Sequence, residues 1–261
     1  MRQYGMFVCL AIAFYLTIGL NARDNITKKV DGVLTVAAAA DLALAFNEIG
    51  ESFEQTTGTP VKIIFSSSGT AREQIANGAP YDVYASANVN FVDELIKKDC
   101  IIADTKELYG IGRVVLAIKK NSTLKIDDVK DLLKPDFKKI SIADPSHAPY
   151  GLAVKETLQS LELWEKMESK FVYGKDIQHS LTLLKTGNVE AGFISLSVVN
   201  NEEYNFIILD DALHNSLRQA IAVVKGTKFE KEARAFIKYV NGQNGRPIMK
   251  KYGFVLPDEI K

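Results

Sequence analysis

The sequence contains little cysteine, which limits how the fold can be held together. Only 2 cysteines occur among 261 residues, and one of them, Cys9, lies in an apolar N-terminal run. If that run is removed, Cys100 is the single cysteine of the mature chain, and an internal disulfide bond is excluded. A chain of this length buries enough apolar surface to fold around a core of its own.

The sequence also has no excess of either charge. Lysine plus arginine and aspartate plus glutamate both number 32, and no long run of either sign occurs. Proteins that bind nucleic acids or membrane surfaces usually carry a basic patch, so neither partner is expected. Any anion that the chain binds must be held by local groups rather than by the overall charge.

Motifs of the common catalytic and metal-binding classes are missing as well. His147, His179 and His214 are far apart in the sequence and have no metal-ligand spacing. Ser68 is not part of a hydrolase nucleophile elbow, and no lysine-containing phosphate loop of the nucleotide-binding type occurs. We therefore expect no enzyme activity, no cofactor and no bare metal cation.

An apolar run near the N-terminus indicates export. Residues 6–20 are uncharged and follow Arg2, a length typical of a secretory signal peptide. We predict a signal peptide over residues 1–22, with cleavage near Ala22, and a periplasmic or other extracytoplasmic location; an uncleaved anchor helix is the alternative. Cys9 does not follow a small-residue cleavage site, which argues against a lipid-modified cysteine.

Short β-branched runs alternate with longer helical patterns, which is typical of sheets with helices on their faces. Leu42, Phe46, Ile49 and Phe53 share one face of the first expected helix, and a second helix is expected over residues 70–77. Strands are expected at residues 33–36, 61–65, 81–85, 113–118, 139–143, 171–173, 191–194, 206–209 and 219–224.

These strands are too many for one small sheet, so the fold is predicted as α/β with two lobes. Each lobe is expected to be a mainly parallel sheet flanked by helices, with a ligand cleft between the lobes. After the signal peptide, we assign residues 23–113 to the first part of lobe 1, residues 114–217 to lobe 2 and residues 218–261 to the C-terminal part of lobe 1.

Several expected strands are followed by loops of small or turn-forming residues that open a helix, at 37–41, 66–70, 144–151 and 174–176. In open α/β sheets such loops converge on a crevice, where helix N-termini offer free N–H groups and the positive end of a dipole. One such loop alone is an ordinary connection with a serine or aspartate cap. Their recurrence indicates a site for a small anion.

A series of short motifs runs through the chain in a characteristic order and spacing: TVAAAADL at 35–42, FSSSGT at 65–70, GAPYDVYASA at 78–87, DP and APYG within 144–151, AGFIS at 191–195 and KYGF at 251–254. In these motifs the chain resembles the periplasmic molybdate-binding proteins of ABC importers, which have the type II periplasmic-binding-protein fold. The resemblance implies a monomer that captures molybdate or tungstate and delivers it to a membrane permease.

Two other ligand classes stay open. One is another tetrahedral oxyanion, such as phosphate or sulfate, because a cage of backbone groups does not rank these ions by sequence alone. The other is an organic acid, bound by a two-lobed sensor. A carboxylate is usually held by an arginine clamp, and Arg72 and Arg113 are the only nearby candidates, both expected away from the loop tips.

The family holds its ligand with hydroxyls and main-chain amides, and the resemblance carries these roles to particular residues. Ser68 matches the ligand serine after the second strand. Tyr150 and Ile177, which open two helices, are expected to offer their backbone N–H groups. Uncharged donors are sufficient, because several preorganised N–H and O–H groups replace the hydration of an oxyanion.

Two ligand positions depart from the family pattern. Ser195 stands where some members have a tyrosine, and Asp41 stands where better-known members have a serine. A carboxylate aimed at a dianion is repulsive. Asp41 therefore either caps its own helix and leaves its backbone N–H for the ligand, or accepts a hydrogen bond from a protonated oxyanion.

Overall fold

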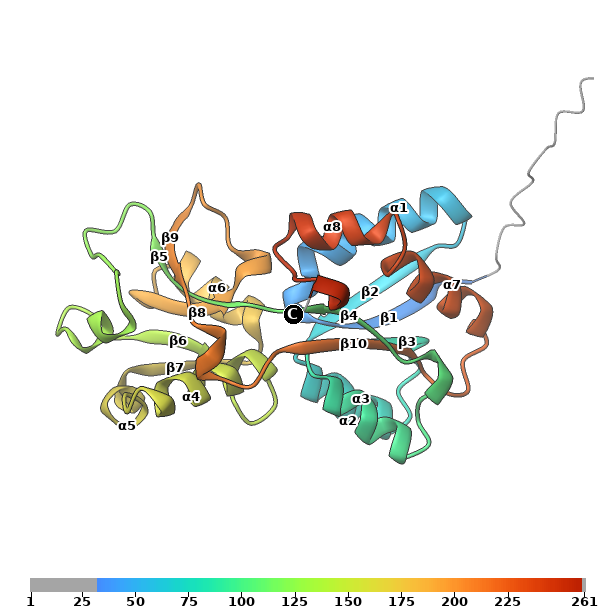
Figure 1. Ribbon diagram of the computed structural model, residues 1–261, viewed down its shortest axis with the longest axis horizontal. Coiled ribbons are helices and arrows are strands. Elements are labelled where there is room, and N and C mark those ends of the chain that lie inside the picture. The colour runs from blue at the N-terminus through green and yellow to red at the C-terminus, as the bar shows by residue number, and fades with distance from the viewer. Residues whose placement is uncertain (1–31, 260–261) are drawn as a thin grey trace, which may run out of the picture.

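A computed structural model describes residues 32–259 of the chain, so the predicted signal peptide lies outside the described residues. Two five-stranded sheets, in the orders β2-β1-β3-β10-β4 and β7-β6-β8-β5-β9, form two lobes that lie side by side (Figure 1). The chain passes from the first sheet to the second at residues 112–113 and returns before residue 218.

All of the predicted strands are present, with ends shifted by a few residues. The first sheet contains β1 (Leu34–Ala39), β2 (Val61–Ser66), β3 (Val83–Ser86), β4 (Glu107–Ile111) and β10 (Arg218–Val223). The second contains β5 (Val114–Lys119), β6 (Ile140–Ala143), β7 (Phe171–Gly174), β8 (Ala191–Ser195) and β9 (Tyr204–Ile208). β4 was not predicted, because its glutamate and glycine weaken the β pattern.

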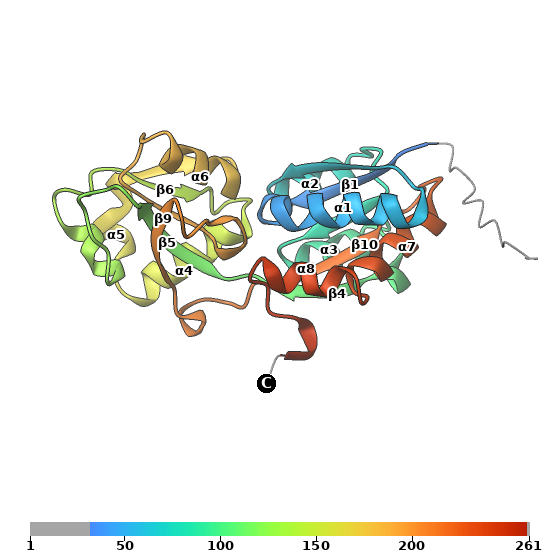
Figure 2. The ribbon, with the colours of Figure 1, turned by 90° about the horizontal axis from the view of Figure 1, so that it is seen from above.

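The helices pack on both faces of each sheet. In lobe 1, α1 (Ala43–Thr57), α7 (Glu230–Val240) and α8 (Gly245–Lys251) lie on one face, opposite α2 (Ser68–Ala76) and α3 (Val89–Lys97) (Figures 1 and 2). Lobe 2 contains α4 (Pro149–Ser160), α5 (Trp164–Met167) and α6 (Ile177–Lys185). Short 3-10 turns η1 (Ala40–Leu42) and η5 (Leu196–Val198) follow β1 and β8.

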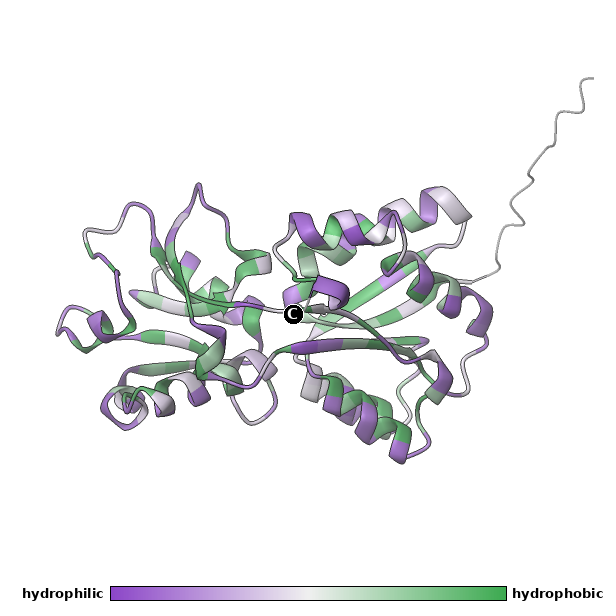
Figure 3. Cartoon of the chain, viewed as in Figure 1, coloured by the Kyte–Doolittle hydropathy of each residue, from purple (hydrophilic) through white to green (hydrophobic). Residues whose placement is uncertain are grey.

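The alternation of side chains along each strand explains why helices cover both faces of the sheet. On β1, Val36 and Ala38 belong to the apolar cluster that contains Phe46 of α1, whereas Ala37 belongs to the cluster under α2 and α3. Successive side chains of a strand point to opposite faces, so a strand that is apolar throughout must be covered twice. Figure 3 shows these apolar strands between helices whose outer faces are hydrophilic.

One strand in each sheet runs against the other four. The pairs β1–β2, β1–β3, β6–β7 and β6–β8 are parallel, whereas β10 and β5 are antiparallel to both of their neighbours. These two strands are reversed because each enters its sheet from the other lobe. The sheets are therefore mixed, and the other strands end at the boundary between the lobes.

The described helices include none with the length and apolar character needed to span a membrane.

The aromatic cluster under α1 provides a test of the core. Phe53 is buried, and its ring centroid lies 5.3 Å from those of both Phe236 and Tyr239. We expect Phe53→Ala to lower the free energy of unfolding by about 3 to 5 kcal/mol, measured by urea denaturation, because the neighbouring rings cannot fill the cavity. Leu44→Ala is the control, since Leu44 on the same helix is 44% exposed and should change stability by less than about 1 kcal/mol.

Candidate functional site

A small cavity lies where the strands of both lobes end. Its volume is about 10 Å³, close to the least that holds one water molecule. The lobes are therefore almost closed on each other. The lining residues come from the ends of β1, β2 and β3 and from the starts of α2, α4 and α6: Ala39, Ala40, Asp41, Ser67, Ser68, Ala87, Ala148, Pro149, Tyr150, Asp176 and Ile177.

Three helices begin at this cavity in the same way. The first main-chain bond of each runs from Ala71 to Ser67 in α2, from Leu152 to Ala148 in α4 and from Ser180 to Asp176 in α6. The amides of Ser68, Tyr150 and Ile177 precede these bonds, so they have no acceptor within their own helix. Free N–H groups and positive dipole ends at the start of a helix are suited to an anion.

Ser68 is held so that its hydroxyl group faces this space. Its Oγ accepts a hydrogen bond from the Ala87 amide at 2.9 Å, and its carbonyl oxygen accepts one from the Tyr84 hydroxyl at 2.7 Å. Ser68 is buried and lines the cavity. Because Oγ acts as an acceptor toward Ala87, the hydroxyl hydrogen is available for an anion.

Asp41 lies at the centre of a buried hydrogen-bonded group. Its Oδ2 accepts hydrogen bonds from the Tyr150 hydroxyl at 2.9 Å and from Gln219 Nε2 at 2.8 Å. Its carbonyl oxygen accepts one from the Ser197 hydroxyl at 2.7 Å. Oδ1 has no partner among the described residues. Oδ2 thus accepts two hydrogen bonds, whereas Oδ1 is buried without a donor.

The prediction that Asp41 caps its own helix is wrong. Neither η1 nor α1 receives a side-chain cap, because the donors of Tyr150 and Gln219 reach the Asp41 carboxylate across the boundary between the lobes and from β10. Asp176 has the capping role instead: its Oδ1 accepts a hydrogen bond from the His179 amide at 2.8 Å at the start of α6.

Burial changes the acidity of this group. The loss of hydration raises the pKa of Asp41 from 3.8 to about 6, although the hydrogen bonds from Gln219 and Tyr150 oppose the shift. Burial raises the pKa of Tyr150 well above its ordinary value, and the neighbouring Asp41 charge raises it further. Tyr150 is therefore a neutral donor to Asp41 at neutral pH.

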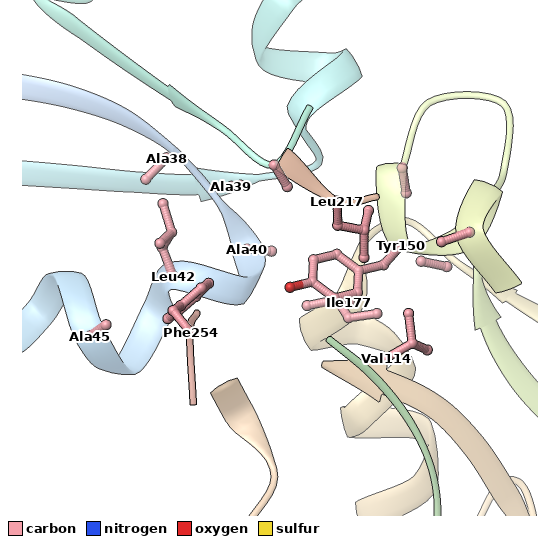
Figure 4. Packing of buried hydrophobic residues seen from close by; sticks show 14 of the residues in the cluster. Ala38, Ala39, Ala40, Leu42, Ala45, Val114, Tyr150, Ile177, Leu217 and Phe254 are labelled. Atoms are coloured by element: carbon pink, nitrogen blue, oxygen red, sulfur yellow. The ribbon is translucent and has the colours of Figure 1, made fainter. Parts of the chain in front are cut away.

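Tyr150 reaches from α4 toward the η1 turn of lobe 1, and Figure 4 shows its hydroxyl group pointing toward the turn that carries Ala40. Ser195 lies behind it, and its Oγ donates to the Tyr150 hydroxyl at 3.1 Å and pairs with the Ser197 hydroxyl at 2.7 Å. Asp41, Ser68, Tyr150 and Ile177 line the cavity, whereas Ser195 is not among the lining residues.

The profile of the bacterial extracellular solute-binding protein family matches residues 34–255. The chain belongs to this family. It is 33% identical to a molybdate-binding protein of Azotobacter vinelandii, over 85% of this chain and 89% of the relative, and 30% identical to one of Rhodobacter capsulatus, over 86% of this chain and 88% of the relative. The resemblance stated from the sequence is confirmed.

The solved structure of an Azotobacter vinelandii periplasmic molybdate-binding protein superimposes with a TM-score of 0.81 at 26% identity and covers 86% of this chain and 99% of that one. The predicted two-lobed α/β class is confirmed with it. This solute-binding protein therefore shares the fold of that structure.

Direct contacts hold the lobes of this solute-binding protein together beside the cavity. Ser67 Oγ lies 2.8 Å from His147 Nδ1, and the Gly69 amide donates to the His147 carbonyl oxygen at 2.9 Å. Gln178 Nε2 donates to the Ala40 carbonyl oxygen at 3.2 Å. These bonds join α2 and η1 of lobe 1 to lobe 2, so the arrangement is a closed one.

The arginines considered for an organic-acid clamp lie elsewhere. Arg72 binds Glu73 and Glu94, and Arg113 lies 3.4 Å from Asp211. Neither arginine lines the cavity. Residues 32–259 also contain no group of three or more His, Cys, Asp or Glu side chains able to hold a metal ion.

The partners that position the site were not predicted from the sequence. Gln219 was assigned only to a strand, although a polar residue at the start of an otherwise apolar run was a signal. Ser197 and the Ala87 amide gave no signal, because nothing local indicates that they bond to Asp41 and Ser68.

The raised pKa of Asp41 predicts a specific pH dependence of stability. The folded chain binds the Asp41 proton more tightly than the unfolded chain, so this group costs about 3 kcal/mol of stability as pH rises from about 4 to about 6. Asp41→Asn should remove this loss, with higher stability than the parent at pH 7 and equal stability at pH 4, measured by urea denaturation across pH. Asp136→Asn changes an exposed aspartate and is the control, so its stability should vary with pH as that of the parent does. If the stability of Asp41→Asn also varied with pH in parallel with the parent, Asp41 would not be the group responsible for the loss.

The approach of the lobes at Gly69 gives a second test. A Cβ added there would lie 2.5 Å from the His147 carbonyl oxygen, which is too close for any side chain. Gly69→Ala should therefore keep the lobes from closing fully, and small-angle X-ray scattering should show a larger radius of gyration than for the parent. Ser146→Ala, at an exposed position next to His147, serves as the control. Equal radii for all three proteins would exclude closure through this contact.

Proposed function

We propose that this protein captures molybdate or tungstate outside the cytoplasm and delivers it to the membrane permease of an ABC importer. The observation that carries the proposal is the small closed cavity at which three helices start and which no lysine or arginine lines. The relatives named as molybdate-binding proteins support the choice of ligand. The protein acts as a monomer, and delivery requires no chemical change in the ligand.

The ligand is held by groups of both lobes. The hydroxyl and the amide of Ser68 bind from lobe 1, and the Tyr150 and Ile177 amides bind from lobe 2. Asp41 contacts the ligand from η1, and Ser195 acts through the Tyr150 hydroxyl. Because the ligand bridges the lobes, bound protein favours the closed arrangement, and the permease recognises the closed surface.

The donors at the cavity favour an oxyanion over an organic acid. A carboxylate is usually held by an arginine clamp, and neither Arg72 nor Arg113 lines this cavity. The buried lining also means that the lobes must open for the ligand to enter and close to hold it. A rigid set of donors then suits oxyanions of one size best, which distinguishes molybdate and tungstate from the smaller sulfate.

Calorimetric titration of the protein lacking residues 1–22 tests the ligand. We expect tight binding of molybdate and tungstate, with one site per chain, and no competition from sulfate at equal concentration. Binding of sulfate or phosphate in preference to molybdate would replace the proposed ligand by another tetrahedral oxyanion. Binding of none of them would reject the function.

Ser68→Ala tests the assigned contacts. The change removes one hydrogen bond to a charged ligand, so we expect a loss of about 1.5 to 3 kcal/mol, equivalent to about tenfold or more in the dissociation constant. Ser66→Ala is a matched control, because Ser66 ends β2 just before Ser68 but does not line the cavity. Equal affinities for the two variants would show that Ser68 does not bind the ligand.

A further inference from the structure

We propose that Asp41 takes up one proton from solvent when the oxyanion binds, so that a neutral carboxylic acid donates a hydrogen bond to the ligand from Oδ1. This inference rests on the proposed function and deepens it, because it makes capture of the ion dependent on pH. The only bond formed is the O–H bond at Oδ1, and the proton comes from water or buffer.

The two oxygens of the carboxyl group have different surroundings. Oδ2 accepts from both Tyr150 and Gln219, whereas Oδ1 has no partner among the described residues although Asp41 is only 1% exposed. An anionic oxygen without a donor is costly in the interior. A proton on Oδ1 removes that cost and turns the oxygen into a donor beside the cavity that Asp41 lines.

The groups that face Asp41 supply no positive charge. Tyr150 of α4 and Tyr109 of β4 are neutral, because burial raises both pKa values well above their ordinary range. Gln219 of β10 and Ser197 of η5 are uncharged donors.

The cavity itself adds only a second carboxylate. Asp176 lines it at the start of α6, where its carboxylate accepts a hydrogen bond from the His179 amide. Lysine, arginine and histidine are all missing from the lining residues of the described chain. A dianion that enters this site therefore meets two carboxylates, and a proton is the available positive charge.

Repulsion between like charges determines how the affinity for the ligand changes with pH. Burial already brings the pKa of Asp41 to about 6, and a dianion at hydrogen-bonding distance raises it further. At a pH between the free and the bound values, the free protein is ionised and the bound protein is protonated. The association constant should then fall about tenfold for each pH unit in this range.

Calorimetry with molybdate in two buffers of different ionisation enthalpy measures the proton directly. For the protein lacking residues 1–22 at pH 7.5, we expect the difference in heat to correspond to about one proton taken up per molybdate bound. The dissociation constant should rise about tenfold between pH 7 and pH 8. Tungstate is a second probe, because it is also free of protons at these pH values.

Asp41→Asn is the decisive variant, because the amide imitates the protonated acid. Its carbonyl oxygen replaces Oδ2 as the acceptor for Tyr150 and Gln219, and its NH2 group replaces Oδ1 as a donor to the ligand. We expect no proton uptake, an affinity independent of pH, and binding at pH 8 at least as tight as that of the parent. Asp41→Ser should also abolish the proton uptake, but it has no NH2 group to replace Oδ1 as a donor to the ligand.

The possible results separate the two proposals. Molybdate binding by the parent without proton uptake, and with the same pH profile as Asp41→Asn, would overturn the role of Asp41 and leave the function intact. Binding of phosphate alone, without uptake from the buffer, would show that the ligand brings the proton and would overturn both. Failure of the folded parent to bind molybdate, sulfate or phosphate would also overturn both.

Discussion

The direction of the strands is the constraint on which the rest of this molecule depends. Strands of both sheets end at one boundary, and the chain must then begin a helix or cross to the other lobe. The two strands that run the other way, β5 and β10, are those that enter from the opposite lobe. The starts of α2, α4 and α6 consequently meet at one cavity, and their first amides have no acceptor in their own helices.

An anion site without cationic side chains follows from this arrangement. Lysine or arginine in so small a space would have to be desolvated and would bind many anions strongly. Backbone amides are fixed by the helices that carry them, so little ordering is required when the ligand arrives. The geometry of the amides, rather than charge, then determines which ion fits.

Asp41 and Asp176 are the two carboxylates that line this site, and the position of Asp41 explains why its burial is tolerated. The carboxyl group is buried with the Tyr150 hydroxyl, the Gln219 amide and the two serine hydroxyls of η5 and β8, and these groups belong to both lobes. A group that bonds across the boundary favours the closed arrangement. The same burial makes its protonation sensitive to any charge placed in the cavity, so closure, ligand and proton become coupled.

The amino-acid sequence by itself determined the two-lobed α/β class, nearly all of the strands and the helix starts that form the site, because these depend on local alternation, on turn residues and on the order of short motifs. The sequence did not reveal what Asp41 contacts. A capping aspartate is a local interaction and therefore the natural expectation at the start of a helix. The actual donors lie 109 and 178 residues away, at Tyr150 and Gln219, and only the packing of the two lobes brings them to the carboxylate.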